Sequence, residues 1–159
     1  MKIEYYPIGV VHSPFKELQG MPIQPSRSEG ASGTVEIFDE FQEGLNDLEG
    51  FSHVILLYHF HVVTDHRLQV VPFLDTVPRG LFATRAPVRP NPIGLSVIRL
   101  ENIQGGVLSV LDLDILDKTP VLDIKPYVTE FDDRTTVRLG WLENALEQKR
   151  KSLSDNRFK

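Results

Sequence analysis

Apolar and polar residues alternate along several short segments of this chain, which is the pattern of β-strands that bury one face. In the clearest run, between Val107 and Ile115, the odd-numbered positions are apolar or small, whereas the aspartates fall on even-numbered positions. Strands are predicted over Ile8–His12, Thr34–Phe38, Phe51–Val63, Leu95–Leu100, Val107–Leu116 and Thr135–Leu139.

Two features indicate how these strands are arranged. Phe51–Val63 is apolar on both faces, so it suits the most buried strand of a sheet or barrel. Gly105 and Gly106 tolerate positive φ angles and therefore predict a tight hairpin between the Leu95–Leu100 and Val107–Leu116 strands. An antiparallel pair is expected there.

Helical patterns are few. Asp39–Leu48 reads as a short helix that Asp39 would cap and Gly50 would end. Trp141–Leu153 has an apolar face and a basic end that suits the helix dipole. Two long loops separate the elements, Lys16–Gly33 and Thr64–Gly80.

This pattern predicts a mainly β protein, and short strands with frequent turns favour a small closed β-barrel with a few short helices over a sandwich. The chain has 159 residues, enough for one domain. We expect residues 1–140 to form the barrel domain and residues 141–159 to form a C-terminal helix and basic tail.

Composition excludes several kinds of site. The chain has no cysteine, so disulfides, thiolate metal sites and cysteine nucleophiles are ruled out. Its first residues lack the apolar core of a signal peptide, and no stretch approaches transmembrane length, so we expect a cytoplasmic protein that does not bind membranes. Neither GxGxxG, GxxxxGK[ST] nor GxSxG occurs, which leaves a Rossmann dinucleotide site, a P-loop or a nucleophile elbow unsupported.

The net charge of −5 argues against a surface that binds nucleic acid over its whole area. Basic residues are nevertheless concentrated between Thr76 and Leu100, a stretch with four arginines and no acid. Such a patch can steer a phosphate-bearing partner locally.

Phe82–Leu95 (FATRAPVRPNPIGL) is the most unusual segment within this patch. Its three prolines fix φ and keep the preceding residues out of the helical region, so the chain is expected to form a stiff extended loop. The loop carries Arg85, Arg89 and Asn91, and its stiffness lowers the entropic cost of presenting these donors to an anionic or polar ligand. A solvated turn between two strands is the alternative.

Three histidines raise the possibility of a metal site. His53, His59 and His61 have the same parity on one extended segment, so they would face the same side. Such a site, completed by His12, Asp112 or Asp114, would indicate a metal-dependent hydrolase or lyase. Alternatively, one histidine is hydrogen-bonded in the core and the others line a pocket or an interface.

A second polar run, Leu116–Tyr127 (LDKTPVLDIKPY), follows soon after. Asp117–Pro120 has the chemistry of a turn. Asp123 and Lys125 then alternate with apolar residues, so both charges would lie on one side of a short strand, either in a polar pocket or as an exposed ion pair.

Four segments, PIGVVHSPF, GFSHVILLYHFH, RPNPIGLS and LDKTPVLDIKPY, together resemble the TsaA-like (TrmO) family of tRNA N6-adenosine methyltransferases. The resemblance implies a compact β-barrel that binds S-adenosyl-L-methionine without a Rossmann fold. It also implies a homodimer with the cofactor site near the interface. The reaction implied is methylation of N6 of threonylcarbamoyl-adenosine at tRNA position 37.

The resemblance assigns the site residues. The cofactor contacts that it implies are Ser13, Pro14, Phe15, Ser52, His53, Arg85, Leu95, Asp117, Lys118, Thr119 and Pro120. Contacts to the RNA substrate are expected from Arg89, Asn91, Lys125 and Tyr127. The nitrogen that receives the methyl group must lose a proton, for which Asp123 or His53 is the candidate acceptor.

The chain departs from the family pattern at two points. Lys118 stands where LDGTP usually has glycine, and the longer bacterial members continue into a sizeable C-terminal domain. Two alternatives therefore stay open within the barrel fold: a cofactor-binding barrel that methylates a substrate other than tRNA, and an RNA-binding barrel without catalysis.

Overall fold

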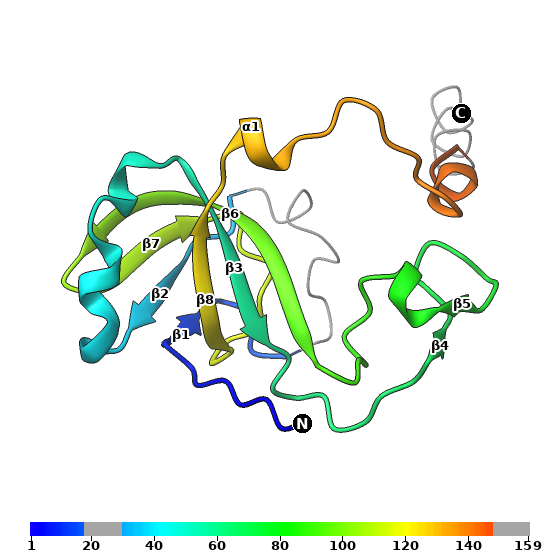
Figure 1. The fold of residues 1–159 in the computed structure, drawn as a ribbon, viewed down its shortest axis with the longest axis horizontal. Coiled ribbons are helices and arrows are strands. Elements are labelled where there is room, and N and C mark those ends of the chain that lie inside the picture. Colours follow the sequence, from blue (N-terminus) through cyan, green and yellow to red (C-terminus); the bar gives the residue numbers. More distant parts are fainter. Residues whose placement is uncertain (18–29, 148–159) are drawn as a thin grey trace.

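The structure is a computed structural model that describes residues 1–17 and 30–147. Six strands close into an antiparallel barrel in the order β1-β2-β7-β6-β3-β8 (Figure 1). Their bounds are β1 Gly9–His12, β2 Gly33–Ile37, β3 His53–His59, β6 Ile93–Gln104, β7 Val107–Leu111 and β8 Pro120–Pro126. The predicted small closed barrel is confirmed.

The barrel encloses the alternate apolar side chains of every strand. Val11, Val35, Leu56, Ile98 and Leu108 are fully buried in this core. Because successive side chains of a strand point to opposite faces, their neighbours in sequence lie on the outside.

The bounds of several predicted strands differ from the observed ones. β6 runs from Ile93 to Gln104 and so extends beyond the predicted Leu95–Leu100 at both ends. β3 ends at His59, and its outer face is only partly covered. β7 ends at Leu111 because Asp112 takes a left-handed φ of 62° that breaks the ladder. The predicted strand Thr135–Leu139 is wrong: these residues are exposed and pair with no neighbouring strand in the described part of the chain.

The glycine hairpin is confirmed. Gly105 and Gly106 have φ angles of 55° and 76° and join β6 to β7. Two positive φ values in succession match the right-handed twist of the strands that the turn connects.

The predicted helix over Asp39–Leu48 is instead two 3-10 segments, η2 (Asp39–Leu45) and η3 (Leu48–Gly50). Asp47, with a φ of 67°, separates them because a left-handed residue cannot continue a helix. Asp39 makes no side-chain cap; its carboxylate accepts a hydrogen bond from Gln42.

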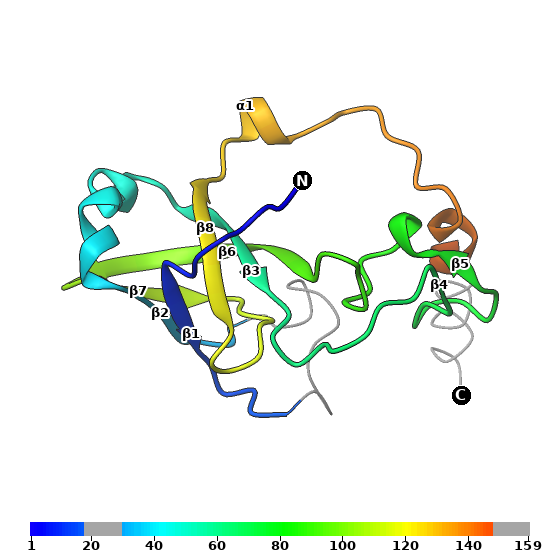
Figure 2. The ribbon, with the colours of Figure 1, turned by 60° about the horizontal axis from the view of Figure 1, so that its bottom comes forward.

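An arm projects from one end of the barrel (Figures 1 and 2). It contains the short antiparallel pair β4 (Gln69–Val70) and β5 (Arg79–Gly80), followed by η4 (Leu81–Ala83). The predicted loop Thr64–Gly80 therefore holds a small sheet.

The C-terminal segment lies against this arm after the short helix α1 (Thr129–Asp132). The Trp141 indole donates a hydrogen bond of 2.9 Å to the carbonyl oxygen of Ala83, and the Arg79 guanidinium lies 5.6 Å from the centroid of the indole ring. The predicted helix Trp141–Leu153 is seen over residues 142–147, and its remainder lies outside the described residues, as do the basic tail and most of the predicted loop Lys16–Gly33. In the described part of the chain, no helix has the length and apolar character needed to cross a membrane.

Candidate functional site

Two loops that are far apart in sequence meet at one end of the barrel, and Asp117 joins them. The Ser13 amide donates a hydrogen bond of 2.9 Å to Asp117 Oδ1, and the Asp117 amide donates one of 2.8 Å to the carbonyl oxygen of Phe15. Lys16 Nζ lies 2.6 Å from Asp117 Oδ2. The structure thus brings the expected contacts Ser13–Phe15 beside the expected contacts Asp117–Pro120.

The backbone of the second loop continues the pairing between β1 and β8. The Lys118 amide donates to the carbonyl oxygen of Val11, and the Val11 amide donates to that of Thr119, at 2.8 and 2.9 Å. The Thr119 side chain is buried, and its hydroxyl lies 3.3 Å from His61 Nδ1. These bonds fix the shape of the turn.

Lys118 adopts the conformation that glycine would adopt at this position. Its φ is 62°, in the left-handed region that costs a residue with a side chain about 1–2 kcal/mol. The Lys118 side chain is exposed, so it leaves the turn through solvent. The departure from LDGTP is therefore accommodated without a change of backbone conformation.

Asp117 is an anchoring group. Its side chain is 9% exposed, and the hydrogen bond from Lys16, assisted by the Ser13 amide, holds the pKa of this carboxyl below its usual range. Asp117 stays ionised at neutral pH, and both of its oxygens are already engaged.

A second polar group lies at this end of the barrel. The Tyr58 hydroxyl is 3.1 Å from Ser96 Oγ, which donates a hydrogen bond of 2.7 Å to Asp114 Oδ1. Burial raises the pKa values of Tyr58 and Asp114, and the charge of the nearby Arg85 partly opposes that rise. From the sequence, Asp114 was a candidate only as a metal ligand, and this polar group was not predicted. Its one local signal is Ser96, a polar residue at an inward-facing position of β6.

The proline-rich loop uses its two arginines differently. Arg89 Nη1 donates to the carbonyl oxygens of Thr84 and Ala86, and its guanidinium lies 5.7 Å from the centroid of the Phe82 ring. Arg89 therefore stabilises the conformation of its own loop. Arg85 and Asn91 are exposed and available to a ligand.

The remaining expected cofactor contacts lie elsewhere on the surface. Leu95, on the outer face of β6, is 49% exposed and pairs with Leu57. Ser52 and His53 lie at the start of β3, joined by a 2.9 Å contact between Ser52 Oγ and His53 Nδ1. His53 packs edge-on against Tyr127. His53 and His59 occupy opposite ends of β3, about 20 Å apart at the rise of a strand, and the Asp117 loop lies near the His59 end, where Thr119 meets His61.

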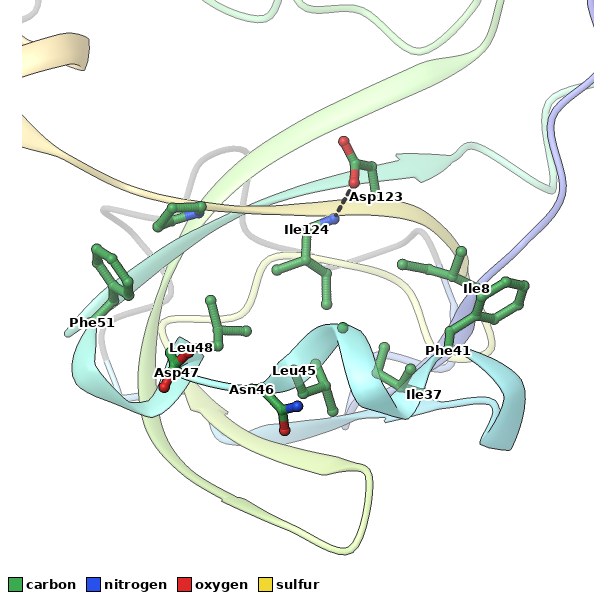
Figure 3. Close-up of a pocket in the computed structure, with 12 residues that line it drawn as sticks. Ile8, Ile37, Phe41, Leu45, Asn46, Asp47, Leu48, Phe51, Asp123 and Ile124 are labelled. Atoms are coloured by element: carbon green, nitrogen blue, oxygen red, sulfur yellow. Dashed lines mark hydrogen bonds between the residues drawn. The ribbon is translucent and has the colours of Figure 1, made fainter.

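Asp123 and Lys125 form the exposed ion pair that was one of the two predicted alternatives. The Lys125 ammonium lies 2.7 Å from Asp123 Oδ2, on the outer face of β8. A cavity of about 370 Å³ lies against the other side of this strand, lined mainly by apolar residues such as Ile37 and Leu45. Figure 3 shows the Asp123 carboxylate turned away from that cavity and bonded to the Ile124 amide.

The histidines do not form the metal site that was one of the two alternative interpretations. Burial and the neighbouring His59 lower the pKa of His61. His53 lies at the far end of β3 from both of them. Within residues 1–17 and 30–147, no three histidine, aspartate or glutamate side chains are placed to share a metal ion.

Comparison with known proteins identifies the relatives of this chain. Residues 10–133 match the family model described as the tRNA-methyltransferase O N-terminal domain. A probable S-adenosyl-L-methionine-binding protein of Pyrococcus abyssi is 54% identical over 99% of this chain and 86% of its own length. The human tRNA (adenine(37)-N6)-methyltransferase is 37% identical over 82% of this chain, but this match spans 31% of the human protein.

The fold has a counterpart among solved structures. A crystal structure of TrmO from Pseudomonas aeruginosa superimposes with a TM-score of 0.75 and 42% identity, covering 89% of this chain and 63% of that one. The match therefore spans less than two thirds of the crystallised chain. Together with the family match over most of the sequence, the shared barrel confirms the resemblance: the chain belongs to the tRNA-methyltransferase O family.

Proposed function

We propose that this protein transfers a methyl group from S-adenosyl-L-methionine to N6 of threonylcarbamoyl-adenosine at position 37 of a tRNA. Its family is one of S-adenosyl-L-methionine-dependent methyltransferases, and the human and mouse relatives are named for adenine 37 of tRNA. The observation that supports the proposal is the pair of loops joined by Asp117, because it brings together two of the four motif segments, PIGVVHSPF and LDKTPVLDIKPY.

The residues at this end of the barrel fit the cofactor. Bound S-adenosyl-L-methionine supplies a methyl group on a positively charged sulfur, which transfers by direct displacement. Arg85 is exposed and suits the cofactor carboxylate, since guanidinium and carboxylate groups form paired hydrogen bonds. Phe15 is half-buried and offers an apolar surface for the adenine. The rigid loops hold these groups in place, so their main contribution is to orient the reactants.

We further propose that the working protein is a homodimer with each site shared between two subunits. Ser52 and His53 lie at the opposite end of β3 from the Asp117 loop of the same chain, and the length of this strand, about 20 Å, is too great for one cofactor to contact both. The arm also exposes large apolar side chains, with Phe73 84% and Phe82 75% exposed, as expected for a surface that packs on a second copy.

Mixed dimers test the shared site. Neither His53→Ala nor Asp117→Ala homodimers should transfer methyl groups efficiently. A dimer with one subunit of each kind contains one site with both wild-type residues. Random exchange of equal amounts makes about half of the dimers mixed, so it should restore about a quarter of the wild-type rate. Activity that stays at the level of the single variants after subunit exchange, verified by mass spectrometry, would contradict the shared site.

The proposed activity is tested by binding and transfer. Calorimetry should detect S-adenosyl-L-methionine but not NAD, and labelled methyl should reach tRNA that carries threonylcarbamoyl-adenosine but not the unmodified transcript. Arg85→Ala should weaken cofactor binding about tenfold or more with the fold intact, because a charge-assisted bond is lost from an exposed loop. The matched control is Arg67→Ala, an exposed arginine of the same arm. Binding without transfer to either RNA would favour a substrate other than tRNA.

A further inference from the structure

A directed chain of hydrogen bonds runs through the mouth of the barrel and ends on a carboxylate. Ser96 has a single hydroxyl proton, which it donates to Asp114 at 2.7 Å. The Tyr58 hydroxyl, 3.1 Å away, must therefore be the donor to Ser96. Tyr58 and Ser96 are 6% and 2% exposed, so water does not compete for these bonds. These two hydrogen bonds hold the Asp114 carboxylate in one orientation.

Asp114 differs from the other aspartates near the site. Asp117 is paired with Lys16, Asp123 with Lys125, and Asp112 with Arg99. In the described part of the chain, Asp114 makes no ion pair within 4 Å. Its carboxylate is half-buried, and Arg85, whose charge does reach it, lies beyond ion-pair distance.

Burial raises the pKa of the Asp114 carboxyl above its usual value. The Ser96 hydroxyl and the Arg85 charge oppose that rise, and Tyr58 remains protonated because burial raises its pKa to about 12. The groups that face Asp114 are thus Ser96 from β6, Tyr58 from β3 and Arg85 from the proline-rich loop. A carboxylate with a raised pKa accepts a proton more readily than an exposed one.

The position of Asp114 also fits a role in transfer. It lies three residues before Asp117, at the end of the barrel where the two cofactor loops meet, and Arg85 is close to it. The two acceptors expected from sequence are less well placed. Asp123 is engaged by Lys125 on the outer face of β8, and the Nδ1 of His53 is engaged by Ser52.

We propose that Asp114 accepts the proton released from the amino nitrogen during methyl transfer. This assignment rests on the proposed function. The bond between the cofactor sulfur and its methyl carbon breaks with its electron pair moving to sulfur, while the nitrogen lone pair forms the new bond to that carbon. The N–H bond then breaks, its electrons stay on nitrogen, and the proton moves to a carboxylate oxygen of Asp114. S-adenosylhomocysteine, methylated adenosine and a protonated Asp114 result.

Single-turnover methyl transfer to tRNA that carries threonylcarbamoyl-adenosine tests the assignment. Asp114→Asn keeps the shape of the side chain and an acceptor for Ser96, but it removes the base. Its rate should fall about 100-fold or more, while cofactor affinity measured by calorimetry stays within about threefold of wild type. The matched control is Asp112→Asn, two residues earlier on the same segment; asparagine tolerates its left-handed φ, and its rate should stay near that of wild type.

The dependence of the rate on pH separates a chemical role of Asp114 from a structural one. The rate should fall as pH drops through the pKa of Asp114. Ser96→Ala leaves the Asp114 carboxylate in place but removes a hydrogen bond that stabilises its charged form. The fall in rate at low pH should therefore occur at a higher pH in this variant. Ser96→Thr, which keeps a hydroxyl, should restore the wild-type profile. The pH profiles of the Ser96 variants remain decisive if Asp114→Asn fails to fold.

The outcomes distinguish the two proposals. Wild-type protein that binds the cofactor and methylates the RNA, together with an Asp114→Asn variant of equal rate, overturns the role of Asp114 and leaves the proposed function standing. A rate lost on Asp123→Asn but kept on Asp114→Asn also overturns it and returns the role to Asp123. Wild-type protein that transfers nothing to this RNA contradicts the proposed function itself, and with it the assignment.

Discussion

Replacing Asp117 by alanine is expected to lower the free energy of unfolding by about 2–3 kcal/mol and to weaken cofactor binding about tenfold or more. The carboxylate accepts hydrogen bonds from the Ser13 amide and from Lys16, and its side chain is 9% exposed. Removing it leaves the Ser13 amide without an acceptor and weakens the link between the two loops, which the backbone bond from the Asp117 amide to Phe15 alone would then maintain. Stability and cofactor affinity should therefore fall together.

Urea unfolding and calorimetric titration with S-adenosyl-L-methionine measure the two effects. Asp65→Ala, at an exposed position on the arm, is the control and should change neither quantity. The stability and cofactor affinity of Asp117→Asn should lie between those of Asp117→Ala and the control. An amide oxygen can still accept a hydrogen bond from the Ser13 amide, but it carries no charge to pair with Lys16. Wild-type affinity in the alanine variant would show that the Asp117 carboxylate does not support the cofactor site.

The pH dependence of stability provides a further check on Asp117. Its pKa is depressed in the folded state, so its contribution is fully present above the unfolded pKa of about 3.9 and is lost as pH falls through the folded pKa. Wild-type protein should lose this part of its stability in acid, and Asp117→Ala should show a shallower loss. Parallel curves for the two proteins would mean that the ion pair with Lys16 contributes nothing in solution.

Gly94→Ala should destabilise the barrel by about 3 kcal/mol, because its mouth has no room for a methyl group. A Cβ at Gly94 would lie 2.2 and 2.4 Å from ring atoms of Tyr58 and 2.9 Å from one of Phe60. The Tyr58 ring is 6% exposed and packs edge-on against Phe60, so it cannot move aside freely. Displacing it would also break its hydrogen bond with Ser96.

Thermal and urea unfolding test this prediction with Gly44→Ala as the control. A Cβ at Gly44 meets nothing within 4 Å, and this glycine lies in η2. The control should be neutral or more stable by up to about 1 kcal/mol, because alanine restricts the unfolded chain more than glycine does. Equal stability of the two variants would mean that the barrel mouth can expand around Tyr58.

The amino-acid pattern alone determined the barrel and its principal strands. Alternation of apolar and polar residues specifies which side chains face inward, and two adjacent glycines specify the β6–β7 hairpin, since both are local properties. Two elements predicted from the sequence pattern are not formed as expected. The predicted strand Thr135–Leu139 had adequate composition but no partner strand, and the predicted helix after Phe38 was interrupted by the left-handed Asp47.

The sequence also identified the loops of the candidate site through their motif residues, but not which of those residues lie together at one end of the barrel. Only the closed barrel determines that Ser13 meets Asp117 and that Ser52 and His53 lie at the far end of β3. It also determines that Ser96 links Tyr58 to Asp114 through hydrogen bonds. These contacts join residues far apart in the chain, and which of them form depends on the register of each strand and the closure of the sheet. Local spacing carries no information about either, so the neighbours of each site residue were decided by the tertiary structure.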